Sequence, residues 1–180
     1  GDTALNASVT GGYSTAVGHQ ALTAMTSGNG NTGIGFAAGD AITSGSSNVA
    51  VGTQALTSNT TASNNTAVGY QSLYSNVTNN NTGLGWKAGY AITTGAQNTA
   101  VGHAALTATT TGTTNTATGF TALYSNTTGS SNTAYGDTAL FSNTTGTAST
   151  AVGYQAGYNN DTGPQLFVGY QSGYSTTTGE

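Results

Sequence analysis

The stretch Asn98-Thr99-Ala100-Val101-Gly102 decides the fold, because the same five residues recur unchanged at 65–69 and in close variants along the chain. Its final residue, which we call the corner glycine, recurs with a period of about 17 residues, and two of its intervals are one residue shorter. The corner glycines are Gly1, Gly18, Gly35, Gly52, Gly69, Gly85, Gly102, Gly119, Gly136, Gly153 and Gly169. A fixed period of this length is typical of repeat architectures, in which each coil is stabilised by stacking on its neighbours.

The residues on either side of the corner glycine predict two short extended segments in each coil. In one coil these are 98–101 and 103–106. Neither is long enough for a helix, and β-branched residues favour a pleated surface. Because side chains alternate along a strand, Thr99 and Val101 share one face of the first segment, and its asparagine and alanine share the other. We expect the valine, alanine and leucine of each coil to form a thin interior.

A second glycine precedes the corner glycine by seven residues in most coils and follows a stretch of polar residues. It stands at Gly11, Gly28, Gly45, Gly95, Gly112, Gly129 and Gly146. We expect it to adopt positive φ in a turn. The two shorter coils lose their residue in this polar stretch, so deletions should fall in a loop and leave the extended segments in register.

One exchange of residues indicates a shared interior. The position four residues after the corner glycine is usually leucine, but where it becomes Gly39, Ile42 follows three residues later. The coil that begins at Gly85 repeats the exchange. In the last two coils no isoleucine follows, and we expect Tyr158 and Tyr174 to fill the space.

Charge is almost absent from the chain. The charged residues among the 180 are Asp2, Asp40, Lys87, Asp137, Asp161 and Glu180. A single lysine gives no electrostatic surface for nucleic acid or anionic lipid, and no apolar run is long enough for a membrane-spanning helix. Cysteine is absent, so there is neither a disulfide framework nor a thiolate metal site. We expect no nucleic-acid partner, no membrane insertion and no cofactor.

The residue directly after the corner glycine varies most and is rich in rings. We treat it as a candidate stripe for a receptor or glycan: His19, Phe36, Tyr70, Trp86, His103, Phe120, Tyr154 and Tyr170. The alternative is a ladder of stacked side chains or a contact between chains. Five residues after the corner glycine a second set recurs: Tyr74, Tyr90, Tyr124, Phe141, Tyr158 and Tyr174.

The sequence offers no catalytic or metal-binding constellation. His19 and His103 occupy equivalent positions five coils apart, or about 24 Å at the spacing of adjacent strands, so one chain cannot place both on a metal ion. The aspartates lie in different coils or loops, whereas glycoside hydrolysis requires two carboxylates within roughly 5 to 10 Å. We expect no enzyme activity and no metal site.

These patterns predict an all-β protein, a β-solenoid of about ten 17-residue coils forming a rod on the order of 50 Å long. The thin interior makes backbone hydrogen bonds between coils essential and favours a further interface. We expect three chains to associate side by side.

Several segments resemble known families. The motifs NTAVGYQSL (65–73), NTAVGHAAL (98–106) and STAVGYQAG (149–157) resemble the head repeats of trimeric autotransporter adhesins. YSNTTGSSNTAYG (124–136) and FSNTTGTASTAVG (141–153) resemble more closely the shaft repeats of phage-type tail-fibre proteins. This likeness covers nearly the whole chain and implies a left-handed parallel β-roll, homotrimeric, outside the cell on a virion tail fibre or a bacterial surface.

A fainter resemblance is to grass-type ice-binding solenoids. Threonine-rich loops such as 108–116 are either solvated turns or a flat array of hydroxyls and methyls that orders water. The function expected first is that of a structural and adhesive fibre segment that spaces or presents a receptor-binding surface. The alternatives are an ice-binding solenoid and a subunit of a homopolymeric extracellular filament. We expect residues 1–180 to form a single repeat array within a longer shaft. Its partners would be other copies of itself and a glycan or receptor on a host surface.

Overall fold

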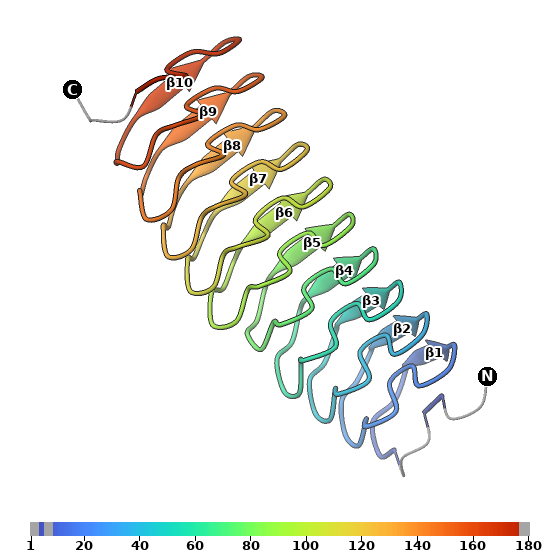
Figure 1. The fold of residues 1–180 in the computed structure, drawn as a ribbon. Coiled ribbons are helices and arrows are strands. Elements are labelled where there is room, and N and C mark those ends of the chain that lie inside the picture. The colour runs from blue at the N-terminus through green and yellow to red at the C-terminus, as the bar shows by residue number, and fades with distance from the viewer. Residues whose placement is uncertain (1–3, 6–8, 177–180) are drawn as a thin grey trace.

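The computed structural model describes residues 4–5 and 9–176, and within that part of the chain it contains ten short strands and no helix. The coils stack along one axis into a rod, with β1 and β10 at its opposite ends (Figure 1). The strands are β1 (Thr15–Val17), β2 (Thr32–Ile34), β3 (Val49–Val51), β4 (Thr66–Val68), β5 (Thr82–Leu84), β6 (Thr99–Val101), β7 (Thr116–Thr118), β8 (Thr133–Tyr135), β9 (Thr150–Val152) and β10 (Leu166–Val168). They form one parallel sheet in chain order, a β-solenoid of about nine turns of about 17 residues. The predicted solenoid is therefore confirmed.

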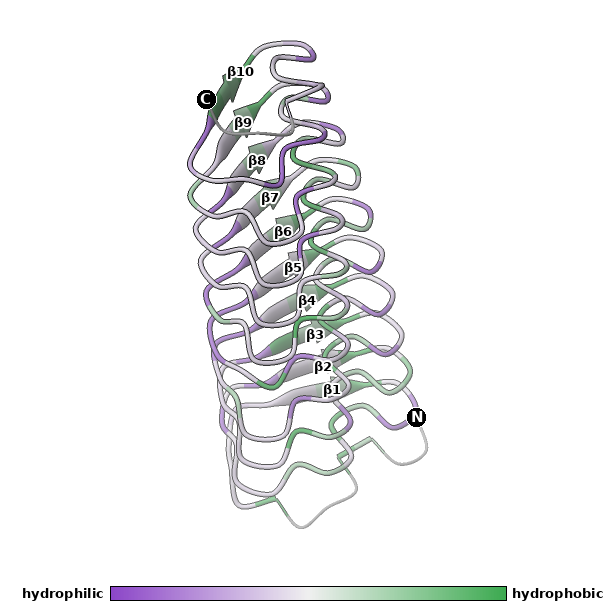
Figure 2. Ribbon diagram, turned by 60° about the vertical axis from the view of Figure 1, so that its left-hand side comes forward, coloured by the Kyte–Doolittle hydropathy of each residue, from purple (hydrophilic) through white to green (hydrophobic). Residues whose placement is uncertain are grey.

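The register between strands follows the sequence period. Thr99 pairs with Thr116, its equivalent in the next coil. In the two shorter coils the pairing also joins equivalent positions, since Thr66 pairs with Thr82 and Thr150 pairs with Leu166. The strands thus keep their alignment, and the loops absorb the missing residue as predicted. Hydrophilic segments recur in successive coils on both sides of the rod (Figure 2).

The interior is built from alanine, leucine and asparagine. In β6 the middle residue Ala100 is fully buried, whereas Thr99 and Val101 are only half-buried. Asn98 is buried on the same side as Ala100. The predicted alternation of faces is confirmed, but the prediction that valine lines the interior is wrong. Since side chains alternate along a strand, an inward alanine leaves both of its neighbours on the outer face.

The segment after the corner glycine is not a second strand, contrary to the prediction. In each coil two of its residues adopt left-handed backbone conformations, as Ala104 (φ 55°) and Leu106 (φ 52°) do. The backbone N–H of Ala104 donates to the carbonyl of Trp86 in the preceding coil, at 2.8 Å. The N–H of Leu106 donates to Ala122 in the following coil, at 3.1 Å. Non-glycine residues persist in this conformation only where the surroundings enforce it, and here hydrogen bonds to both neighbouring coils do so.

The two repeated glycines are required for different reasons. Gly102 has a φ of +130°, and a Cβ atom there would lie 2.3 Å from the carbonyl oxygen of Gly119 in the next coil. Gly112, from the second set, does not have positive φ, so that expectation is wrong. Its Cβ atom would lie 2.3 Å from the carbonyl oxygen of Gly129. The second glycine is therefore required because adjacent coils approach closely there. Other residues of this loop, such as Thr114, have the positive φ angles.

The exchange of leucine for isoleucine preserves the volume of the interior. Ile42 is fully buried, and its Cδ1 atom would lie 2.9 Å from a Cβ atom added at Gly39. Ile92 stands in the same relation to Gly89. The prediction that the apolar volume moves without being lost is confirmed.

At the C-terminal end of the rod a different residue fills the space beside the glycines. The ring of Phe167 packs against both Gly157 and Gly173, since Cβ atoms there would come within 2.6 Å and 2.1 Å of it. Phe167 occupies the middle of β10, where most strands carry alanine. The prediction that Tyr158 and Tyr174 fill this space is wrong, because both belong to a stacked column of partly exposed rings.

A ladder of buried asparagines runs through the solenoid beside the strands. The Oδ1 atom of Asn98 accepts hydrogen bonds from both the backbone N–H and the Nδ2 of Asn115, at 3.0 and 3.2 Å. The Nδ2 of Asn98 donates to the carbonyl of Gly112, at 2.9 Å. Each asparagine side chain therefore links its own coil to the next by hydrogen bonds. Because the side chains are buried, water could not replace these bonds if they were removed.

Replacing Asn98 by alanine should lower the free energy of unfolding by about 2 to 4 kcal/mol, because it removes three hydrogen bonds and leaves the buried N–H of Asn115 without its acceptor. Urea-induced unfolding followed by circular dichroism measures the change. Asn79→Ala is the matched control, since the Asn79 side chain lies on the surface and accepts one hydrogen bond from Ser63. Equal losses for the two variants would contradict a structural role for the ladder.

The orientation of the strands is tested by two truncations in one coil. Leu106→Ala should cost about 2 to 5 kcal/mol, the usual range for a buried leucine, because Leu106 is fully buried. Val101→Ala on the outer face should cost less than about 1 kcal/mol. Thermal and urea unfolding of both variants, at concentrations where single chains predominate, give the comparison, and a larger loss for Val101→Ala than for Leu106→Ala would contradict the inward orientation of the leucine.

Candidate binding surface

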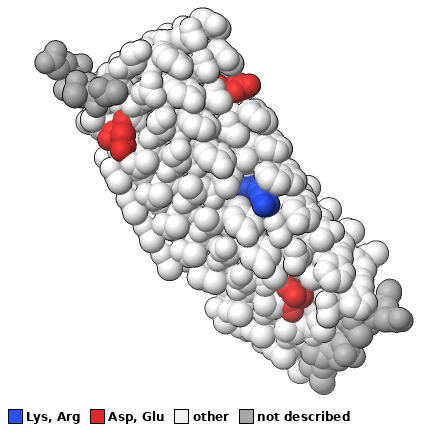
Figure 3. All heavy atoms as spheres, viewed as in Figure 1, with Lys and Arg blue, Asp and Glu red and all other residues white. Residues whose placement is uncertain are grey.

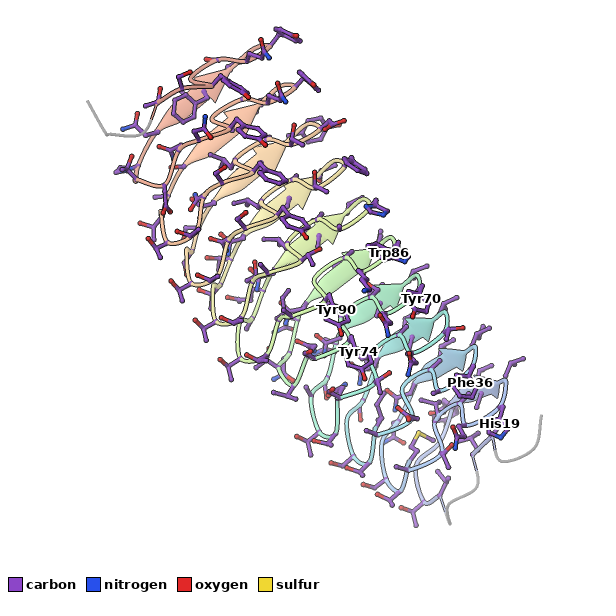
Figure 4. All side chains as sticks on the ribbon, in the orientation of Figure 1. His19, Phe36, Tyr70, Tyr74, Trp86 and Tyr90 are labelled. Carbon is purple, nitrogen blue, oxygen red and sulfur yellow. The ribbon has the colours of Figure 1, made fainter. Side chains whose placement is uncertain are left out.

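The candidate stripe forms a line of rings beside the ends of the strands. We call it the first column; Figure 4 labels four of its members, His19, Phe36, Tyr70 and Trp86, which follow one another along the rod. Its residues are exposed. Each follows a corner glycine that ends the strand segment and turns the chain, so every coil presents this residue at an equivalent place.

The rings of the first column stack face to face. Ring centroids are 5.6 Å apart for His19 and Phe36, and 4.5 Å apart for Trp86 and His103. The remaining stacked pairs are Tyr70 with Trp86 (6.5 Å), His103 with Phe120 (5.0 Å) and Tyr154 with Tyr170 (5.3 Å), and all interplanar angles are 17° or less. The structure thus brings the eight predicted residues into three runs, and the ladder of side chains weighed in the sequence analysis exists.

A second column lies five residues after the corner glycines. Tyr74 stacks on Tyr90 at 5.2 Å. The longer run has centroid distances of 5.3, 5.1 and 5.0 Å and consists of Tyr124, Phe141, Tyr158 and Tyr174. Thr107 occupies the equivalent position between the two runs. Figure 4 shows Tyr74 and Tyr90 in a line separate from that of Tyr70 and Trp86.

A row of polar side chains lies between the columns, which the sequence analysis missed. The Nζ atom of Lys87 is 4.7 Å from the centroid of Trp86 in the first column and 5.1 Å from that of Tyr90 in the second. At equivalent positions the Nε2 of Gln71 donates to the Oε1 of Gln54, at 3.0 Å. The recurrence of glutamine two residues after the corner glycine was the signal in the sequence. The two columns and this row therefore form one continuous surface.

Stacking decides which parts of the rings a ligand can reach. A sugar stacks on an aromatic face, but within each run the faces cover one another at about 5 Å and only the ring edges point to solvent. Uncovered faces occur where a column is interrupted. In the first column the interruptions are Thr53 and Asp137, and both residues are exposed.

The outer face of the sheet forms a second surface. It consists of one row that is mostly threonine, as in Thr99, Thr116 and Thr133, and one row that is mostly aliphatic. Ile34 and Val152 of the aliphatic row are 39% and 37% exposed. The threonine-rich loop 108–116 forms a turn, the alternative weighed for it, since hydroxyls of such loops bond to the next coil, as that of Thr110 does to the carbonyl of Thr127. The regular threonine array lies on the strands.

Charges are few and lie apart on the surface (Figure 3). Partial burial opposes ionisation of Asp161, but hydrogen bonds from the Thr144 side chain and from the backbone N–H groups of Thr145, Thr144 and Gly146 lower its pKa below the ordinary value. Burial raises the pKa of Asp40 above its ordinary value, and this effect outweighs two backbone hydrogen bonds that lower it. Asp161 therefore caps a loop and belongs to the scaffold. Asp2 and Glu180 lie outside the described residues.

The surface carries no enclosed site in the part of the chain that the structure describes. No pocket is present there, and no three histidine or acidic side chains come together to hold a metal ion. Likewise, residues 4–5 and 9–176 include no helix long and apolar enough to cross a bilayer. His19 and His103 are in separate runs of the first column. On the described residues, the candidate binding surfaces are the open sides of the rod.

No protein-family model matches the chain, and neither a curated protein nor a solved structure matches it.

Proposed function

We propose that the chain is a structural and adhesive segment of an extracellular fibre, of the tail-fibre or surface-adhesin kind, which spaces or presents a receptor-binding surface and has no catalytic role. The observation that carries the proposal is the unbroken stack of ten parallel strands, which fixes every coil in the same orientation along one axis. Such a stack is a rigid spacer. It also repeats each exposed side chain in a line, which suits attachment through many weak contacts.

Composition supports a role in an exposed fibre. Many of the exposed side chains are threonine, serine, asparagine or glutamine. Five acidic residues and one lysine are the formal charges of the chain. A surface of this kind attracts neither nucleic acid nor anionic lipid. The aromatic columns are then the most distinctive chemistry on the rod, and we place receptor or glycan contact on their side.

The outer face of the sheet supports lateral association of three chains. Its aliphatic row includes Val17 (56% exposed), Val168 (64%) and Ile34 (39%). Uncharged, flat and partly apolar, it can pack against equivalent faces without burying an unpaired charge. The aromatic columns lie outside the strands, so a trimer formed through the sheet would leave them accessible.

The fibre proposal predicts a homotrimer that appears in electron micrographs as a rod of fixed length. Multi-angle light scattering gives the mass in solution. Val101→Lys should convert the trimer to monomers, since it places a charge in the middle of the aliphatic row. Thr94→Lys, in an exposed loop of the same coil, is the matched control and should leave the trimer intact. A wild-type monomer would contradict lateral association, and continuous fibres would favour end-to-end polymerisation.

A second candidate is ice binding, favoured by the threonine row on the flat outer face of the sheet. This function needs the face that a trimer would bury, so the two proposals exclude each other. The monomer should then show thermal hysteresis. Thr116→Tyr should reduce it by more than half by disturbing the flat face, whereas Thr94→Tyr in the loop should not. Absence of hysteresis in the wild-type chain removes this candidate.

A further inference from the structure

The interruption of the first column at Asp137 leaves two ring faces opposite one another. Phe120 stacks on His103 with one face, and Tyr154 stacks on Tyr170 with one face. Their other faces point toward the coil between them, which carries Asp137 in place of a ring. Phe120 is 52% exposed and Tyr154 is 42% exposed, so both remain accessible from solvent.

The spacing of the solenoid sets the size of this gap. Phe120 and Tyr154 belong to coils two steps apart, which places their rings about 9.6 Å apart along the axis. Within the column, neighbouring rings are 4.5 to 6.5 Å apart. A compact group that takes the place of one ring would therefore contact both faces at the distance that the column itself maintains.

The residue that interrupts the column is charged, and this charge selects the kind of group that could bind. Asp137 is exposed, and within the described residues its carboxylate makes no hydrogen bond. Aromatic faces are the negative side of the ring quadrupole and attract cations. Two such faces and a carboxylate all favour positive charge, and Lys87, the chain's one lysine, lies three coils away.

The same surface already holds a cation in this way. The Nζ atom of Lys87 rests against Trp86 and Tyr90, at 4.7 and 5.1 Å from the ring centroids. Lys87 contacts one ring of each column, whereas a cation between Phe120 and Tyr154 would lie between two ring faces of one column. The second arrangement adds a carboxylate that the Lys87 contact lacks.

We propose that Phe120, Asp137 and Tyr154 form a binding site for a quaternary ammonium group. A methylated ammonium ion suits the site because its positive charge is spread over its methyl groups. These methyl groups are apolar and can pack directly on the ring faces. The neutral interruption at Thr53, between Phe36 and Tyr70, has the same spacing without the carboxylate. It is an internal comparison site within the same chain. The inference does not depend on the fibre proposal.

The test titrates the full chain with tetramethylammonium chloride at constant ionic strength, while the backbone amide signals are followed by NMR. We expect weak, saturable shifts at Phe120, Asp137 and Tyr154, with no saturation around Thr53. Asp137→Asn should weaken binding about fivefold, the factor expected from removing one charge at about 4 Å in water. Thr53→Asp should create a second site of similar affinity between Phe36 and Tyr70.

Two further variants separate a binding role from a structural one. Phe120→Leu removes a ring face and should weaken binding, and thermal unfolding by circular dichroism confirms that the rod remains folded. Asp161→Asn removes a carboxylate elsewhere on the rod and should leave the affinity unchanged. The proposal is wrong if Asp137→Asn binds as the wild type does, if both interruptions bind equally, or if no saturable shift occurs. Saturable binding of methyl glucoside that survives Asp137→Asn would also overturn it and identify a glycan site.

Discussion

Hydrogen bonds between the backbones of successive coils are the constraint on which the rest of this structure depends. They occur in the strands and also in the turns, where Ala104 donates to the preceding coil and Leu106 to the following one. Because a single short coil buries little apolar surface, its backbone must find partners in its neighbours. The small residues of the interior follow from this constraint, since bulky ones would hold the coils apart.

The buried asparagines extend the same principle to side chains. A polar group inside a protein is costly unless it is fully hydrogen-bonded, and Asn98, Asn115 and their equivalents satisfy that condition through one another and through backbone carbonyls. The ladder therefore fixes register as well as stability: a slip by one residue would place threonine where the amide is needed. Where the ladder ends at Ser149, its hydroxyl bonds to Thr162, and Asn160 from another position donates to it.

Much of this arrangement was accessible from the sequence because period and register coincide. Identical residues that recur at one fixed interval must lie above one another in a stack of coils, so the rows of Ala100, Leu106 and Asn98 and the runs of rings such as Trp86 and His103 could be predicted. What failed depended on backbone conformation. Left-handed Leu106 and Thr114 carry no glycine to mark them, so the second segment was taken for a strand.

Side-chain direction explains the other errors. Val101 was assigned to the interior because it is hydrophobic. Since it lies two residues after Thr99 in the same strand, it shares the outer face with that threonine. Phe167 was overlooked because it replaces a small residue in one coil alone. The contact of Lys87 with both columns required knowledge of how closely the two rows of rings approach, and the turn between them determines that distance.

The loss of a single residue from two coils, with pairing preserved at Thr66–Thr82 and Thr150–Leu166, shows how tolerant the loop edge is. The addition or deletion of a whole coil can be tolerated in the same way, because the coils that then become neighbours make the same contacts with each other. Unequal recombination between near-identical repeats would then lengthen or shorten the rod in steps of about 4.8 Å. It would also change the order of residues such as Thr53 and Asp137 along the first column. In such a protein, length and surface pattern can evolve by shuffling segments of DNA, without any redesign of the interior.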